Sequence, residues 1–287
     1  MHWSEARDLV RKWREDNARK SQELVEIWES TLKDKVHKLG DEQFQVLEQV
    51  CIGAIDCHRI DVAEYCLKKL TSQFKDSSRI LLLSAMEFEA VEMYDDAIEI
   101  LDAMIKRDET NPAPRKRKIA ILRSRGRTIE AIKALTDYLK RFAIDQEAWQ
   151  ELCDLYLIEQ EYGKAAFCME ELILHNPHNH LFHERLAEIR YTQGGFDNLE
   201  SARSYYCQAL KLNRNNMRAL FGLYLTAYSI ATSQKCVSAK KKEAHSLMSW
   251  AMKRISQRYK ETAADKSQID ALEGLMGSLQ LGSNSNL

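Results

Sequence analysis

The histidines of the segment HNPHNHLFH are the side chains whose types and spacing come nearest to a metal site. They are His175, His178, His180 and His183. A zinc site needs three or four converging donors, ordinarily with support from Cys or carboxylate side chains. These histidines surround Pro177, which marks a turn, so we interpret them as a turn with one packed imidazole rather than as a metal site. We therefore predict neither a bound metal nor a cofactor. The rival hypothesis, a metal-dependent enzyme, requires stoichiometric metal in the purified protein.

The cysteines and the familiar catalytic motifs give no sign of an active site. Seven cysteines are widely spaced, and no two of them have C-x-x-C spacing. The tightest group is Cys51, Cys57, His58 and Cys66, whose spacing does not match the common structural zinc sites. An odd number of dispersed cysteines is typical of reduced, packed thiols. The chain also lacks a nucleophile elbow, an H-E-x-x-H motif and a phosphate-binding glycine loop. We predict no catalytic residues and no enzymatic activity.

A dense run of cations is the strongest charge feature of the sequence. Between residues 115 and 127 there are seven cations and no acid. Such a run can contact an acidic partner, or it can be the solvated face of a helix. No aromatic residue interleaves with it, so base stacking on single-stranded nucleic acid is disfavoured. The two remaining alternatives stay open for this basic patch, which consists of Arg115, Lys116, Arg117, Lys118, Arg123, Arg125 and Arg127.

The composition indicates what kind of elements position these groups. The 287 residues include only 10 Gly and 3 Pro, with 45% hydrophobic and 30% charged side chains. The small number of turn-forming residues excludes a β-sandwich or barrel. The proportions of hydrophobic and charged side chains suit amphipathic helices. The net charge of -1 gives no general attraction to nucleic acid. No apolar stretch approaches the ~20 residues that span a bilayer. The charged start MHWSEARDLVRKW predicts no secretory signal and a cytosolic chain.

A repeat of 34 residues organises most of the chain. Ala63, Ala97, Ala131 and Ala165 are spaced by 34, and Ala202 follows after 37. A small side chain at a recurring position allows two helices to cross closely. One copy carries a Trp, a Leu, a Tyr, the Ala and a Pro in the pattern of the tetratricopeptide repeat (TPR). We predict an all-α TPR α-solenoid, a right-handed superhelix of antiparallel helix pairs.

The repeat register divides the chain into four parts. Residues 1–43 are expected to form N-terminal capping helices, and residues 44–216 form five TPR repeats. Residues 217–259 form a degenerate sixth helix pair that contains a polar, basic loop at 232–243. Residues 260–287 form a C-terminal helix and a disordered tail.

The first helix of each repeat, helix A, lines the concave wall of a TPR stack, so the register predicts a partner-binding groove. The wall changes along the chain from apolar to basic, then acidic, then aromatic, which suits one extended partner. Some of these side chains can instead pack between helices. Lys116 is followed by Ala120 where chaperone-binding domains have asparagine, so a co-chaperone role is disfavoured. The predicted groove residues are Ile52, Ile55, Leu82, Met86, Lys116, Arg123, Asp154, Leu157, Glu188, Tyr191, Phe221, Leu225 and Tyr228. The same register adds Gln45, Glu48, Arg79, Gln150, Leu181, Glu184 and Arg218 to the wall.

Phrases between the repeat positions resemble a known family. They are RKWRE (11–15), YDDAI (94–98), RKRKIAI (115–121), DQEAW (145–149), KAAFC (164–168), NPHNH (176–180), YTQGG (191–195), QALKLN (208–213) and NMRALFGLY (216–224). They are similar to the subunit 2 family of the endoplasmic reticulum (ER) membrane protein complex, from about residue 3 to residue 280. Glu109 departs from the pattern, which has proline there, and the C-terminus is shorter. Whether the chain is the ordinary subunit or a diverged paralogue stays open.

The resemblance implies a non-enzymatic scaffold on the cytoplasmic face of the ER membrane, with no transmembrane segment of its own. It implies that the solenoid holds cytosolic segments of subunits 3 and 5 and carries subunit 8 or 9. It further implies that the complex inserts tail-anchored and multipass transmembrane helices. The alternative is a free TPR adaptor that captures peptide segments of partner proteins. No nucleic-acid partner is expected on either hypothesis.

Overall fold

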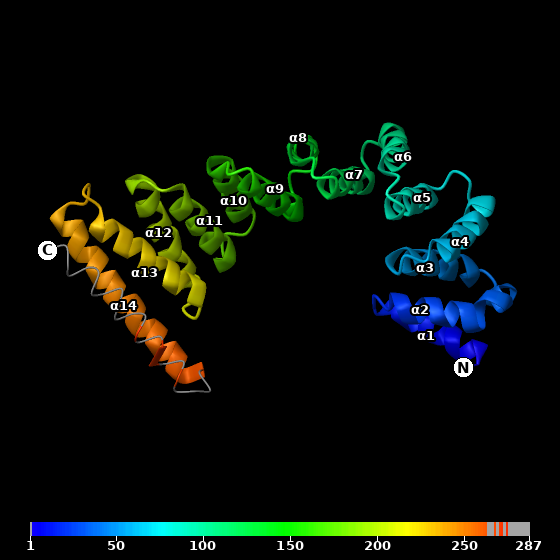
Figure 1. The fold of residues 1–287 in the computed structure, drawn as a ribbon, viewed down its shortest axis with the longest axis horizontal. Helices are drawn as coiled ribbons and strands as arrows, with labels where there is room; N and C mark the ends of the chain where they lie inside the picture. The colour runs from blue at the N-terminus through cyan, green and yellow to red at the C-terminus, as the bar shows by residue number, and fades with distance from the viewer. Residues whose placement is uncertain (1, 263–266, 268–269, 272–273, 275–287) are drawn as a thin grey trace. The chain divides into compact units, whose positions relative to one another are not determined.

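The computed structural model describes residues 2–262, 267, 270–271 and 274, and these residues form helices and no β-strand (Figure 1). The prediction of an all-α fold is confirmed. The chain divides into two compact units, residues 1–134 and residues 135–287. No helix in the described part of the chain is long and apolar enough to cross a bilayer.

The first unit begins with a short helical segment that precedes the repeats. It consists of α1 (Trp3–Glu15), α2 (Ser21–Ile27), a π-helical turn η1 (Trp28–Leu32) and a 3₁₀ segment η2 (Lys33–Leu39). The apolar stripe of this segment is buried, with Val10, Trp28 and Leu32 at most 1% exposed. These side chains join one core with the helices that follow, so the segment covers the apolar face of the first repeat.

The repeats of the first unit are regular pairs of helices. The pairs are α3 (Glu42–Asp56) with α4 (Ile60–Gln73), and α5 (Ser78–Ala90) with α6 (Tyr94–Arg107). They are followed by α7 (Pro112–Ser124), and α8 (Thr128–Leu139) spans the boundary between the units. Asn111 caps α7 by accepting a hydrogen bond from the backbone N–H of Ala113 at 3.0 Å. Pro112 is the first residue of that helix, a position where a missing N–H costs nothing.

The second unit contains three further pairs. They are α9 (Gln146–Ile158) with α10 (Tyr162–His175), α11 (His180–Gln193) with α12 (Phe196–Leu212), and α13 (Met217–Thr232) with α14 (Ser238–Thr262). The loop between α13 and α14 covers only residues 233–237, because residues 238–243 of the predicted basic loop belong to α14. The C-terminal helix and tail predicted for 260–287 lie almost entirely outside the described residues.

The turn inside each of the first four repeats has the same backbone conformation. His58, Glu92, Gly126 and Gln160 all have positive φ, between 58° and 69°. These residues are 34 apart. In each repeat the next backbone N–H donates to the carbonyl five residues earlier, at 2.8 or 2.9 Å. Such a bond satisfies a carbonyl that the end of helix A leaves unpaired. Three of these four positions carry a side chain, which costs on the order of 1 kcal/mol each.

The recurring alanines lie where the two helices of each pair cross. Ala63, Ala97, Ala131, Ala165 and Ala202 are all 0% exposed. In the first repeat, Cys51 Sγ of α3 lies 3.8 Å from the carbonyl oxygen of Ala63 on α4. The backbones therefore approach closely at this position, and the alanine periodicity of the sequence reports a packing requirement.

Candidate functional site

The predicted groove residues lie on the A helices of both units, which are α3, α5 and α7 in the first and α9, α11 and α13 in the second. We call the faces that carry them the A-helix wall. None of the groove residues is buried: Arg123, Asp154 and Leu225 are exposed, and the others are half-buried. Their side chains are therefore available at a surface, while their role in binding a partner stays a prediction.

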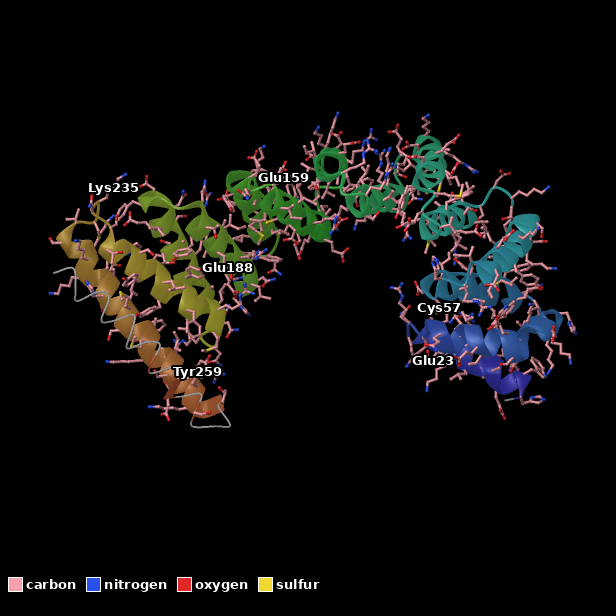
Figure 2. All side chains as sticks on the ribbon, viewed as in Figure 1. Glu23, Cys57, Glu159, Glu188, Lys235 and Tyr259 are labelled. Atoms are coloured by element: carbon pink, nitrogen blue, oxygen red, sulfur yellow. The ribbon has the colours of Figure 1, made fainter. Side chains whose placement is uncertain are left out.

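In the second unit the wall contains two adjoining depressions. The larger, of about 390 Å³, is lined by Asp154, Leu181 and Glu188. The smaller, of about 310 Å³, is lined by Leu157, Tyr191 and again Glu188. The structure thus brings together the predicted groove residues of α9 and α11. Figure 2 labels Glu188 on α11.

The last three predicted groove residues, all on α13, lie outside these depressions. Phe221 packs together with Tyr191 against a buried cluster of the second unit. Tyr228 packs against a different cluster, while Leu225 is 41% exposed. The aromatic end of the wall is therefore partly used in packing, and Leu225 is its most accessible apolar side chain.

Two arginines neutralise much of the acidic stretch of the wall. Arg185 lies 3.3 Å from Glu188 and 3.4 Å from Asp154. Arg218 lies 2.7 Å from Glu188 and 3.1 Å from Glu184. The wall therefore carries a network of paired charges that presents both signs to a partner, rather than a bare acidic strip. Arg185 was not among the predicted wall residues.

The ion pairs between successive repeats follow a spacing that sequence reasoning could have used. Arg185 follows Asp154 by 31 residues, and Arg218 follows Glu188 by 30. In the first unit Arg79 follows Glu48 by 31 residues and binds it through two hydrogen bonds of 3.1 and 2.6 Å. Where the repeat is 34 residues long, a separation of 31 places the cation one repeat later and about one helical turn back. Between α11 and α13 the step is 37 residues, so the separation of 30 places Arg218 about two turns back. An acid followed by arginine at this distance is the missed signal.

Glu184 is a buried acid whose partners tie α11 to the turn before α13. Its side chain is 7% exposed and receives, besides Arg218, a short hydrogen bond from Asn216 Nδ2. Asn216 also caps α13, because its Oδ1 accepts from the backbone N–H of Ala219 at 3.1 Å. Asn216 is 8% exposed, so water cannot readily replace it. One side chain therefore satisfies both a helix terminus and a buried carboxylate.

Asn216→Ala is expected to lower the free energy of unfolding by about 2 kcal/mol, because it removes a cap and a donor to a buried charge. Asn179→Ala is the matched control. Asn179 caps α11 through the N–H of Leu181 at 3.0 Å and donates to no buried acid that the structure describes, so its loss is expected to cost about 1 kcal/mol. Urea unfolding followed by circular dichroism measures both changes. Equal losses in the two variants would contradict the role given to Glu184.

In the first unit the wall adjoins a larger cavity. The cavity, of about 680 Å³, is lined by Ile52 and Glu48 of α3, by Arg79, and by residues of the N-terminal segment such as Trp13. Ile52, Ile55 and Met86 pack at the edge of the N-terminal core. Leu82 packs against another cluster formed around α5 and α6. Ile52, Ile55 and Met86 therefore share one core, while Leu82 packs against another.

The basic patch is tied to acids of its own unit. Arg117, Lys118 and Arg125 pair with acids on α5 and α6, in the preceding repeat, and Arg127, the residue before α8, pairs with an acid of α8. The pairs are Arg117–Glu89, Lys118–Asp102, Arg125–Asp95 and Arg127–Glu130, each at 2.6 Å. Lys116 and Arg123 also have interactions within the chain. The cation run therefore helps to join successive repeats, and its use by an outside partner stays a prediction.

The histidine segment is built into the fold. His183 is 6% exposed; its Nε2 lies 2.9 Å from the carbonyl oxygen of Pro177, and its ring stacks on that of Tyr205. His180 lies between Asn213 and Asn216, at 3.1 and 3.0 Å. Within the described residues, no three His, Cys, Asp or Glu side chains are grouped as a metal would need.

Four of the buried cysteines are poor nucleophiles. Burial raises the pKa of the Cys51, Cys66, Cys153 and Cys168 thiols to about 12. Thiols with such pKa values are protonated at neutral pH, and the thiolate is the form that attacks or binds metal. These four side chains therefore act as small apolar groups at the helix crossings.

Comparison with known proteins places the chain among relatives of one kind. Residues 69–201 match the family model described as EMC2 TPR-like repeat domain. The chain is 46% identical over 283 residues to ER membrane protein complex subunit 2-B of Xenopus laevis, covering 97% of this chain and 95% of that protein. It is 28% identical over 243 residues to ER membrane protein complex subunit 2 of Dictyostelium discoideum, covering 80% and 76%. The fold is similar to the C-terminal part of a TPR repeat-containing protein from Cytophaga hutchinsonii, with a TM-score of 0.61, 15% identity and coverage of 94% and 98%.

Proposed function

Because this chain belongs to the family of ER membrane protein complex subunit 2, we propose that it acts as a non-enzymatic scaffold on the cytoplasmic face of the ER membrane. It holds cytosolic segments of the membrane-embedded subunits, so that the complex can insert tail-anchored and multipass helices. The partners are subunits 3 and 5 and either subunit 8 or subunit 9, and the chain attaches to the membrane through them.

The observation that carries this proposal is the chemistry of the A-helix wall. In the second unit, exposed leucines stand beside a network of paired charges. Leu181 is 55% exposed and lines a depression together with Asp154 and Glu188. Apolar side chains at the centre of such a surface supply affinity, and the surrounding charges fix the register of the bound segment. A wall of this kind holds an extended segment without any chemical step.

The wall is tested by placing charge on its exposed leucines. The variant Leu181→Asp with Leu225→Asp is expected to reduce recovery of the other complex subunits at least about tenfold, since two apolar contacts are lost and two acids are introduced. The measurement is co-purification of the tagged full-length chain from detergent-solubilised membranes, with quantification of each co-eluting subunit. Both leucines are more than a third exposed, so the fold is expected to persist.

The matched control is Leu174→Asp with Val237→Asp. These residues are 76% and 64% exposed and give the same change in charge. Leu174 lies on α10, the second helix (helix B) of the fourth repeat, and Val237 lies in the loop after α13. The control is expected to recover the subunits as the unaltered chain does. If the unaltered chain is recovered from membranes without other subunits, the scaffold is excluded. A chain that then fractionates away from membranes and binds peptides on the wall would be the free adaptor.

A further inference from the structure

A second groove lies between α12 and α14, which are the second helices (the B helices) of the last two pairs. Its volume is about 650 Å³, close to the 680 Å³ of the cavity described above in the first unit. It is lined by the apolar residues Leu210, Leu223 and Trp250 and by the cations Lys211, Arg214 and Arg254. We call it the helix-B groove. It shares no lining residue with the two depressions of the A-helix wall.

The floor of the helix-B groove is apolar and one side is aromatic. Leu210 and Leu223 are 4% and 1% exposed, so they form a fixed floor. Trp250 of α14 is 44% exposed although it lies beside these leucines. A large aromatic side chain that stays half uncovered next to an apolar floor is the kind of residue that dominates protein–protein contacts. This groove can therefore receive an apolar side chain.

The charge around the groove has a single sign. Among the residues that the structure describes, three cations and no acid line it. Lys211 and Arg214 are exposed, and neither forms an ion pair with any residue that the structure describes. Arg254 donates to the neutral Gln257 at 3.1 Å. The nearby acid Glu243 is paired with Arg203 at 3.1 Å. These cations differ from those of the A-helix wall, where Arg185 and Arg218 are paired with acids of the wall itself.

We propose that the helix-B groove binds an acidic segment of a partner protein, which inserts an apolar side chain against Trp250 and places carboxylates beside Lys211 and Arg214. Uncompensated cations around an apolar pocket select a ligand that combines acids with a hydrophobic anchor, because a basic segment would be repelled. This surface is additional to the A-helix wall, and its use does not depend on the function proposed for that wall.

The test uses fluorescence anisotropy of labelled peptides with the full-length chain. The probe is a fluorescein-labelled peptide with leucines at helical spacing and glutamate at all the remaining positions. Its two controls replace all glutamates by lysine or all leucines by serine. The glutamate–leucine peptide is expected to bind, and each control peptide is expected to bind at least about tenfold more weakly. Added salt is expected to weaken the binding.

Variants then locate the binding site. Lys211→Glu with Arg214→Glu, and separately Trp250→Ala, are each expected to weaken binding at least about tenfold. The control Lys241→Glu with Lys242→Glu makes the same charge change at exposed positions of α14 outside the groove, and it is expected to change affinity less than about twofold. Thermal unfolding confirms that each variant is folded.

Three results would overturn the proposal. One is no binding of the glutamate–leucine peptide at millimolar concentration. Another is an equal loss in the groove variants and in the Lys241/Lys242 control, which would show a general charge effect. The third is that the chain binds phosphatidylserine vesicles but not the peptide, and that the groove variants lose the vesicle binding. That result would mean that the groove binds a lipid surface. If the Leu181→Asp with Leu225→Asp variant loses subunit recovery but still binds the peptide, the groove and the wall are separate binding surfaces.

Discussion

Ala165→Trp is expected to lower the free energy of unfolding by about 3 kcal/mol, because it forces an indole into a helix crossing that has no space. Ala165 is 0% exposed on α10, and the neighbouring core residues Cys153 and Cys168 are each 1% exposed. Protein interiors are packed as densely as organic crystals, so a side chain of this size must push α9 and α10 apart. The same separation would disturb the depressions that α9 and α11 form on the A-helix wall.

The control for this prediction is Leu174→Trp on the same helix. Leu174 is 76% exposed, so the indole can remain in water and the unfolding free energy is expected to change by less than about 0.5 kcal/mol. Urea titration followed by circular dichroism measures both variants. Retained stability in the Ala165 variant would show that the repeat register is wrong, since that register rests on the small side chain at this position.

The repeat and its helix pairs could be predicted from the sequence because they depend on local patterns. Ala63 and Ala165 report a packing constraint that recurs in every pair, and the apolar positions around them follow helical spacing. The turn conformation was not predicted. Only Gly126 among the four positive-φ turn residues is a glycine, while His58, Glu92 and Gln160 carry side chains there. The hydrogen bond that closes each turn overrides their intrinsic preference, so residue type alone does not reveal it.

The candidate site was predicted less completely, because its electrostatics depend on contacts between repeats. The sequence places Asp154 and Glu188 on one wall, but it does not show that Arg185 and Arg218 pair with them. The basic patch contains no acid of its own, and the partners of Arg117, Lys118 and Arg125 come from the preceding repeat. The helix-B groove combines Lys211 of α12 with Trp250 of α14. The two residues are far apart in the sequence, and no local motif joins them.

Gly222→Ala is expected to lower the free energy of unfolding by about 3 kcal/mol, despite the ~1 kcal/mol that alanine gains over glycine within a helix. A Cβ atom on Gly222 would lie 2.3 Å from Cζ of Tyr206. Tyr206 is 3% exposed, so its ring cannot swing into solvent to make room. The ring also lines the smaller depression of the A-helix wall beside Leu157 and Tyr191. The glycine on α13 therefore sets the position of an α12 side chain that lines this depression.

Gly163→Ala is the matched control, because Gly163 also lies within a helix but its new Cβ would meet only Gln193 Nε2 at 4.0 Å. That substitution is expected to leave the unfolding free energy unchanged or to raise it by up to about 1 kcal/mol. In a Tyr206→Ala background the clash is absent, so Gly222→Ala is expected to cost much less than in the unaltered chain. Urea unfolding of the four combinations at positions 206 and 222 measures this coupling. Additive losses would mean that the ring of Tyr206 does not occupy the space beside Gly222.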